Sequence, residues 1–403
     1  MLKSFHNAFL AGDRRFVALR GLSLLLALSF ALLYSKQLGV ERRGLLTFIM
    51  ITNLVFSILF ISGISLHLRN LTKKGDGEKY LGPYLFLIVV FSLITPLLNY
   101  LTLNLYKSLF SASIPNNLMY ISLLYCFLST LSYGVHDALL LIKSLGLASF
   151  MDISTLLIQI AGYFTLLYAG EISYFVSVLT SISISYLVFI FSSLVLLLYV
   201  YKPSFNISVD SLRALFKDSS SPYLINFASL ILERVDKVFI GLQTSSGDLA
   251  RYSTSQSIFG LTSFVSYAVS TLTLARNRIY LSLAKVSYLH IGLMIVATLG
   301  FAWLVENFIQ FALGPEWLNS LSLLFFIAVV EVIRGFHKVL LANLTQQDKI
   351  NQLKTTTRIQ LSLGLLVQPI AVFLLGVVGS VIINISILLF GIFVMRKYYE
   401  DKA

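Results

Sequence analysis

Long apolar stretches dominate the pattern of hydrophobic and polar positions along this chain of 403 residues. Stretches of about 18 or more mostly apolar residues recur from end to end, and each can cross about 30 Å of hydrocarbon as a helix. The pattern predicts twelve transmembrane helices, at residues 16–35, 44–66, 82–106, 117–142, 149–169, 172–200, 222–242, 252–275, 286–306, 319–341, 356–375 and 377–395. We therefore expect an all-α polytopic membrane protein, and the even number of spans puts both termini on one side.

One connection between spans has a pattern of its own. Between residues 201 and 221, Leu212, Leu215 and Phe216 alternate with charged residues, which suits a short helix lying at the membrane interface. Six predicted spans precede this connection and six follow it, an arrangement common among secondary transporters. We therefore predict a six-helix lobe over 1–203, a cytoplasmic linker with an interfacial helix over 204–221, and a second six-helix lobe over 222–403.

The composition supports assignment to the membrane proteins, and the distribution of basic residues explains the net charge. Hydrophobic residues make up 57% of the chain and charged residues 12%, as expected for a polytopic membrane protein. The formal charge of +12 could suit nucleic acid, but 22 of the 30 basic residues fall on the side that holds the termini. The positive-inside rule makes that side cytoplasmic. We expect membrane lipids as partners and no nucleic acid.

Several common catalytic and binding motifs are missing from the sequence. The single Cys126 and five scattered histidines provide no disulfide framework and no CxxC metal site. The chain has no Walker A motif, no glycine-rich dinucleotide loop and no GxSxG motif. We therefore expect a protein that is not an enzyme and that needs no cofactor or metal.

A charge cluster interrupts the seventh predicted span. Glu233-Arg234-Val235-Asp236-Lys237 stands inside 222–242, and charges at membrane depth usually face a bundle interior or a water-filled cavity. In one interpretation Glu233 and Lys237 neutralise each other as an i,i+4 pair. In the other, Arg234 and Lys237 face a cavity and bind phosphate or acidic sugars. Glu233 and Asp236 are then candidates for ion pairing or for coupling.

The tenth predicted span repeats the pattern. Glu331, Arg334 and Lys338 fall within about 60° on a helical wheel, and Arg334 lies too deep to reach the interface. Two interpretations stay open: Glu331 and Arg334 form a buried pair, or they line a cavity. Near the predicted cytoplasmic helix ends, Arg20, Arg276 and Arg278 can either anchor the protein at the interface or contact substrate.

Three segments resemble a known family. Arg20 with its apolar run, Lys36-Gln-Leu-Gly-Val-Glu-Arg-Arg-Gly44 and Gly63-Ile-Ser resemble the start of polysaccharide-repeat-unit flippases of the Wzx type. The stretch from Leu232 to Gly241 and on to Gly247-Asp-Leu-Ala-Arg-Tyr-Ser253 is similar to their seventh-helix signature, and Leu313-Gly-Pro-Glu-Trp-Leu-Asn-Ser320 to a later external turn. The chain thus resembles members of the multidrug/oligosaccharidyl-lipid/polysaccharide exporter superfamily.

The resemblance implies a MATE-like fold, with two lobes around a central cavity, in the bacterial inner membrane. It also implies a flippase that moves an undecaprenyl-diphosphate-linked oligosaccharide of O-antigen (lipopolysaccharide), capsule or exopolysaccharide by alternating access. A glycan polymerase and a chain-length regulator are the expected partners. Arg276 and Arg278 depart from the family's apolar-proline ending, which makes them a candidate capture site for diphosphate.

Two other functions stay open. A cation-coupled multidrug or small-molecule exporter of the same superfamily needs an acid in a lobe cavity. The first span has none, whereas Asp236 meets the need in the second lobe. A membrane-embedded glycan polymerase needs a large external platform, and the short predicted external loops argue against it.

The charge distribution generates a topology prediction. In a Cys126→Ala background, single cysteines near three sites should react only from the cytoplasmic side: Lys74, Asp218 and Lys349. The C-terminus should also be cytoplasmic. Cysteines at three other sites should react with an impermeant maleimide added to intact cells: Arg42, Asp248 and Glu316. External labelling at Asp218 would reverse the orientation.

Overall fold

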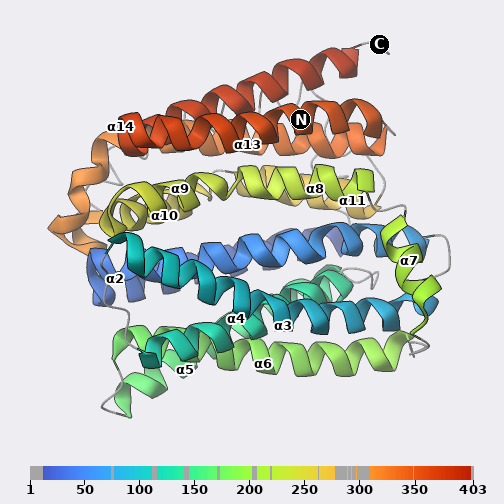
Figure 1. The fold of residues 1–403 in the computed structure, drawn as a ribbon, viewed down its shortest axis with the longest axis horizontal. Helices are drawn as coiled ribbons and strands as arrows, with labels where there is room; N and C mark the ends of the chain where they lie inside the picture. The colour runs from blue at the N-terminus through green and yellow to red at the C-terminus, as the bar shows by residue number, and fades with distance from the viewer. Residues whose placement is uncertain are drawn as a thin grey trace. The chain divides into compact units, whose positions relative to one another are not determined.

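The computed structural model describes residues 12–73, 77–110, 116–139, 145–169, 173–201, 207–217, 220–261, 263–276, 309–347 and 349–400, with the single residues 288, 292 and 296. Every secondary-structure element in these ranges is helical (Figure 1). This confirms the predicted all-α class. The predicted ninth span, 286–306, lies almost wholly outside the described residues.

The first half of the chain follows the predicted spans closely. It forms α2 (Gly12–Lys73), α3 (Gly77–Phe110), α4 (Asn116–Leu139), α5 (Leu145–Tyr168) and α6 (Tyr174–Tyr201). The predicted interfacial helix is α7 (Val209–Lys217), which buries Leu215 and packs against α3 while Val209 is exposed. The amphipathic pattern of this segment therefore gave the right element.

In the described part of the chain, six helical segments are long and apolar enough to cross a membrane: Phe16–Ser65, Lys79–Ser108, Leu118–Leu139, Ser149–Tyr168, Tyr174–Tyr199 and Asn351–Tyr398. The first and the last have 50 and 48 residues. A straight helix of that length would extend about 75 Å, more than twice the hydrocarbon thickness. Each of these two segments is long enough for two crossings.

Both long segments turn back at a glycine. In α2 the turn is Gly39, with φ 71° and ψ 172°, and in α14 (Ile350–Glu400) it is Gly376, with φ 59° and ψ −141°. Across the second turn, the Gln368 side-chain amide donates to Ser380 Oγ at 2.7 Å, and Gln360 donates to the carbonyl of Ile387 at 3.0 Å. These bonds join antiparallel arms. The two predicted spans 356–375 and 377–395 are therefore the arms of one helical hairpin (α14, red in Figure 1).

The seventh and eighth predicted spans are not continuous helices. α8 (Ser220–Leu232) and α9 (Val235–Gln243) are separated by a turn at Glu233 and Arg234. α10 (Ser246–Phe259) and α11 (Phe264–Arg276) are separated at 260–263. Apolar length alone predicted unbroken helices here, and that was wrong. Irregular backbone at membrane depth is tolerated where protein buries it or where it lines a water-filled cavity. The tenth span is a 3-10 turn (Pro315–Ser320) followed by α13 (Leu321–Gln346).

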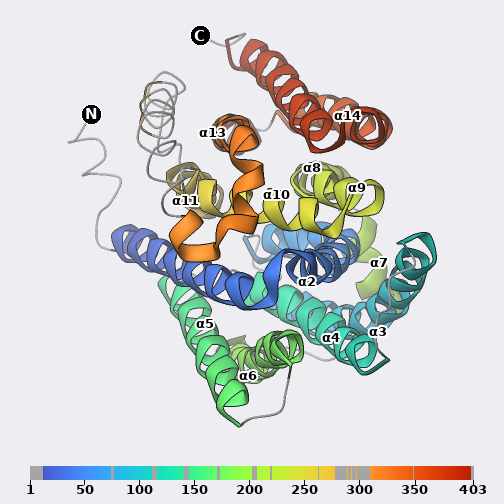
Figure 2. The same cartoon turned by 90° about the vertical axis from the view of Figure 1, so that its left-hand side faces the viewer.

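The chain forms two compact units, one of residues 1–47 with 232–403 and one of residues 48–231. In the second unit, apolar side chains of α2, α3, α4 and α6 build a core around the fully buried Leu68, Ile88 and Val135. Figure 2 shows α5 beside α6. Hydroxyl groups also link α4 to α2 and α3 in this unit. Thr130 Oγ1 lies 2.8 Å from Ser57 Oγ and 2.9 Å from Thr95 Oγ1. The predicted division at 203 and 222 stays a prediction.

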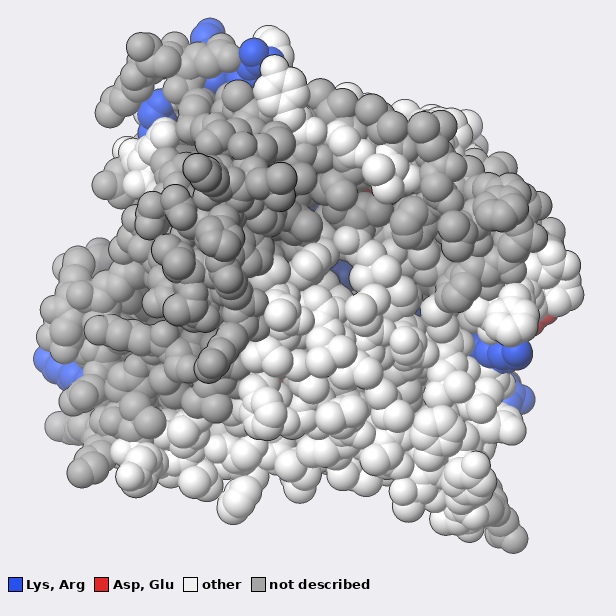
Figure 3. Space-filling model, turned by 180° about the vertical axis from the view of Figure 1, so that it is seen from behind, with Lys and Arg blue, Asp and Glu red and all other residues white. Residues whose placement is uncertain are grey.

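The described surface is suited to lipid. Large apolar side chains are exposed on several helices, among them Leu93 on α3, Phe191 on α6 and Phe373 on α14. On the face shown in Figure 3, uncharged residues cover most of the described surface. Lys and Arg gather towards its margins, apart from a few basic atoms near its centre. Exposed apolar surface of this extent indicates contact with a membrane.

The turn glycine of α14 generates a stability prediction. Gly376→Ala should lower the free energy of unfolding by about 1–3 kcal/mol, because its backbone lies in a region that residues with a side chain rarely adopt. Gly162→Ala is the matched control. A Cβ there would meet Ser181 at an ordinary 3.5 Å inside a regular helix. Thermal unfolding in detergent measures both, and equal melting temperatures for the two variants would contradict the prediction.

Candidate functional site

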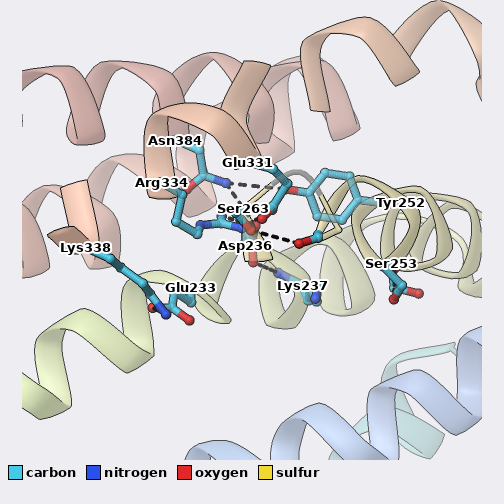
Figure 4. Close-up of polar contacts among 12 residues, drawn as sticks. Glu233, Asp236, Lys237, Tyr252, Ser253, Ser263, Glu331, Arg334, Lys338 and Asn384 are labelled. Carbon is cyan, nitrogen blue, oxygen red and sulfur yellow. Dashed lines mark hydrogen bonds and ion pairs between the residues drawn. The ribbon is translucent and has the colours of Figure 1, made fainter. Parts of the chain in front are cut away.

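Charged side chains gather at the break between α8 and α9. Glu233, Asp236 and Lys237 are all buried there, Asp236 completely. One face of α13 directs Glu331, Arg334 and Lys338 towards them (Figure 4). The structure thus brings together the charges of the seventh and tenth predicted spans, which the sequence could identify only separately.

The acids of this cluster are paired with cations of α13. Arg334 forms an ion pair with Glu331, and its second terminal nitrogen lies 3.9 Å from Asp236 Oδ2. This contact is the Glu331–Arg334 pair that one of the two interpretations expected. Lys338 Nζ lies 2.6 Å from Glu233 Oε1 and 3.5 Å from the centre of the Tyr267 ring.

This pairing corrects one expectation. Glu233 does not pair with Lys237, because the helix breaks between them and the i,i+4 geometry is lost. At the break, Glu233 instead meets Lys338 of α13, whose side chain is only 14% exposed.

Asp236 is held by three helices. Its Oδ2 accepts a hydrogen bond from the Tyr252 hydroxyl of α10 at 2.6 Å and one from the Asn384 side-chain amide of α14 at 2.9 Å. Its Oδ1 accepts from the backbone N–H of Lys237 at 2.7 Å. Sequence reasoning missed Asn384 as a site residue. The available signal was a polar amide inside the last apolar span.

Two cations of the cluster are left over. Among the described residues, neither Lys237 nor Arg234 forms a side-chain hydrogen bond or an ion pair. Lys237 is only 6% exposed, but its ammonium nitrogen is not sealed from the surface. In Figure 4 Lys237 points away from Arg334, to the same side of the helices as Ser253. Arg234 is half-buried at the break. The arrangement therefore presents paired acids and unpaired cations, which suits an anionic ligand.

The remaining candidate cations lie elsewhere in the sequence. Arg20 is half-buried on the first arm of α2, and Arg276 ends α11. Arg278 lies outside the described residues. Their role as substrate contacts stays a prediction. Within the described ranges, the structure shows no group of three or more His, Cys, Asp or Glu that could hold a metal ion.

Comparison with known proteins identifies the fold. No family model matches the chain, and no curated protein matches it. Among solved structures, it is similar to the lipid II flippase MurJ in an inward closed conformation, with a TM-score of 0.71 and 16% identity over 96% of this chain and 87% of that one. It is also similar to the MATE transporter VcmN of Vibrio cholerae in the bent form, with a TM-score of 0.61 and 12% identity over 96% and 97%. An inward-facing multidrug resistance MATE family transporter of the MOP superfamily gives a TM-score of 0.62, with 12% identity over 98% and 100%.

These similarities extend over nearly the whole chain. The protein therefore has the all-helical fold that MurJ and the MATE transporters share. The predicted MATE-like fold class is confirmed. At such low identity the similarity identifies the fold, and the substrate has to be argued from the site.

The pairing pattern generates a prediction for a double-mutant cycle. Glu233→Gln and Lys338→Met should each destabilise the protein, and their coupling free energy should be about 1–3 kcal/mol, as expected for side chains in direct contact. The control cycle combines Glu233→Gln with Lys237→Met and should give a coupling near zero, because these two side chains are not paired. Denaturant unfolding in mixed micelles measures both cycles. A larger coupling for Lys237 than for Lys338 would restore the i,i+4 pair.

Proposed function

We propose that this protein is a flippase that moves an undecaprenyl-diphosphate-linked oligosaccharide across the bacterial inner membrane by alternating access. The cargo would be a repeat unit of O-antigen, capsule or exopolysaccharide. The observation that carries the proposal is that Arg234 and Lys237, at a broken helix, form no side-chain ion pair with a described residue, while the neighbouring acids contact cations of α13. The similarity to a lipid II flippase supports it.

The chemistry of such a cargo fits these residues. A diphosphate and its sugars cannot cross hydrocarbon without a polar route, whereas the lipid tail can stay in the bilayer. Guanidinium and ammonium groups form strong charge-assisted hydrogen bonds to phosphate oxygens. Because Glu233 and Asp236 are engaged by α13, they form no side-chain ion pair with Arg234 or Lys237. The four cations of the cluster face three acids, so one positive charge is left over for an anionic headgroup.

The helix break adds to this attraction. α9 begins directly after Arg234, which gives the helix no side-chain cap. The N-terminal end of a helix carries a partial positive charge, which favours anions. The charge of Arg234 and the dipole of α9 therefore attract the same kind of ligand, and broken helices of this type form substrate sites in many transporters.

The other candidate cations receive different roles. Arg334 is occupied by Glu331 and Asp236, so we assign it to organising the cluster. Arg276 and Arg278 are proposed to capture diphosphate at the cytoplasmic end, and Arg20 to contact it there. Two lobes with both termini in the cytoplasm, together with a glycan polymerase and a chain-length regulator as partners, complete the proposal.

A second candidate is a cation-coupled exporter of drugs or other small molecules. The observation that favours it is Asp236, a completely buried acid that is hydrogen-bonded to Tyr252 and Asn384. The multidrug MATE neighbours have the same fold. The two candidates differ in cargo, so a cargo assay separates them.

The flippase proposal generates a prediction for Arg234. In cells that depend on this protein for surface glycan, Arg234→Ala should lower export by about tenfold or more, the cost of losing a charge-assisted contact. Arg234→Lys should retain part of the activity, because it keeps the charge and loses the planar fork. Lipid-linked repeat units should accumulate in the cytoplasmic leaflet. Protein abundance should stay normal, since both neighbouring acids keep their partners on α13.

The matched control is Arg358→Ala, which removes an exposed arginine of α14 and should leave export unchanged. Undiminished export by Arg234→Ala would show that this arginine does not meet the substrate. If loss of the protein left surface glycan intact and instead sensitised cells to cationic drugs in an Asp236-dependent way, the exporter would replace the flippase.

A further inference from the structure

Arg43 is another buried cation, and no acid in the described part of the chain balances it. It lies on α2 just after the turn at Gly39 and is only 6% exposed. Its Nε donates to Ser35 Oγ at 3.0 Å and one terminal nitrogen donates to Thr47 Oγ1 at 2.7 Å. Its guanidinium carbon lies 4.9 Å from the centre of the Tyr34 ring. All these partners are neutral, and among the described residues no carboxylate pairs with Arg43. A buried charge is costly without a counter-charge.

The acid nearest to it in sequence is engaged elsewhere. Glu41 accepts a hydrogen bond from the Ser246 hydroxyl in the first turn of α10. A Cβ on Gly247 would lie 2.9 Å from the second carboxylate oxygen of Glu41, so that oxygen also packs against α10. The exposed Glu41 thus contacts α10, and Arg43 is left with hydroxyl groups and an aromatic ring.

Thr47, the hydroxyl partner of Arg43, contacts α10. Thr47 Oγ1 lies 3.3 Å from Ser253 Oγ on α10. Lys237 points to the same side of α9 and α10 as Ser253 (Figure 4). The second terminal nitrogen of Arg43 forms no hydrogen bond to a described residue, and neither it nor the Lys237 ammonium is sealed from the surface. Arg43 therefore reaches α10 through a pair of hydroxyls, on the side of α9 and α10 to which Lys237 also points.

We propose that Arg43, Thr47, Ser253 and Lys237 form an anion-binding site that holds the diphosphate of the lipid carrier. The proposal rests on the proposed flippase function and adds Arg43, Thr47 and Ser253 to Lys237, one of the two cations already proposed to meet the headgroup. The guanidinium and the ammonium supply the charge-assisted donors that phosphate oxygens require. The Thr47 and Ser253 hydroxyls now donate to the carbonyls of Arg43 and Ala250, at 2.9 and 3.1 Å, and would have to rotate to donate to a phosphate. The turn at Gly39 lies on the predicted external side. The site therefore belongs to the part of the route where the headgroup leaves the protein.

Binding of radiolabelled inorganic pyrophosphate to the purified full-length protein in detergent tests this site, at constant ionic strength. The wild type should bind pyrophosphate saturably and more tightly than it binds glucuronate, a carboxylated sugar. Arg43→Gln should weaken pyrophosphate binding by about tenfold or more. The control Arg42→Gln removes the neighbouring exposed arginine and should bind like the wild type. Arg43→Lys keeps the charge and should give an intermediate affinity, which provides a second measurement if Arg43→Gln is not monodisperse.

Unchanged pyrophosphate binding in Arg43→Gln, or in Arg43→Lys where only that variant folds, would overturn the proposal. An equal loss in Arg42→Gln would also overturn it, because it would show a non-specific effect of charge. Tighter binding of glucuronate than of pyrophosphate would refute the diphosphate assignment. Arg43-dependent pyrophosphate binding by a protein that exports no glycan would support this site and refute the proposed flippase function.

Discussion

The cost of placing charge at membrane depth governs the architecture around the break in the seventh span. Each buried acid there contacts a cation from another part of the unit or from its own helix face, and Glu331 and Asp236 share the single charge of Arg334. Lys338 meets Glu233, and Arg334 lies between Glu331 and Asp236. Removing one member of such a pair would leave an uncompensated charge. The pairs therefore fix α13 against the start of α9, and the Asn384 contact with Asp236 fixes α14 there as well.

The same constraint gives meaning to the cations that remain unpaired. Arg234, Lys237, Arg334 and Lys338 face three acids, Glu233, Asp236 and Glu331, which leaves one positive charge in excess. Arg43 adds a second. A phosphodiester group carries one negative charge, so the two phosphoryl groups of a lipid-linked diphosphate would balance this excess. A cation as cargo would increase it. The charge balance therefore favours the flippase over the exporter.

Much of the fold follows from local patterns in the sequence, and the site does so only in part. Apolar length located the spans of the first half of the chain and the two arms of α14, and the amphipathic segment at 210–217 located α7. The turn between the arms of α14 falls at Gly376, because a turn with positive φ favours glycine. The pairing at the break could not be found this way, since the partner of Glu233, Lys338, lies far along the chain. An i,i+4 rule considers only partners on the same helix. Asn384 was hidden for a similar reason, because its partner Asp236 lies in another span.

The fold and the charge pattern answer different questions. Structures described as a lipid II flippase and as multidrug transporters resemble this chain over nearly its whole length, so the fold is compatible with either kind of cargo. What distinguishes the cargoes is which charges the protein leaves unpaired. A carrier of cationic drugs would need acids that are free to meet the drug or a coupling ion. Here Asp236 is bonded or paired to Arg334, Tyr252 and Asn384, whereas the Lys237 side chain has no such partner among the described residues. The side chains with spare binding capacity are therefore the cations, and a ligand that uses them has to be an anion.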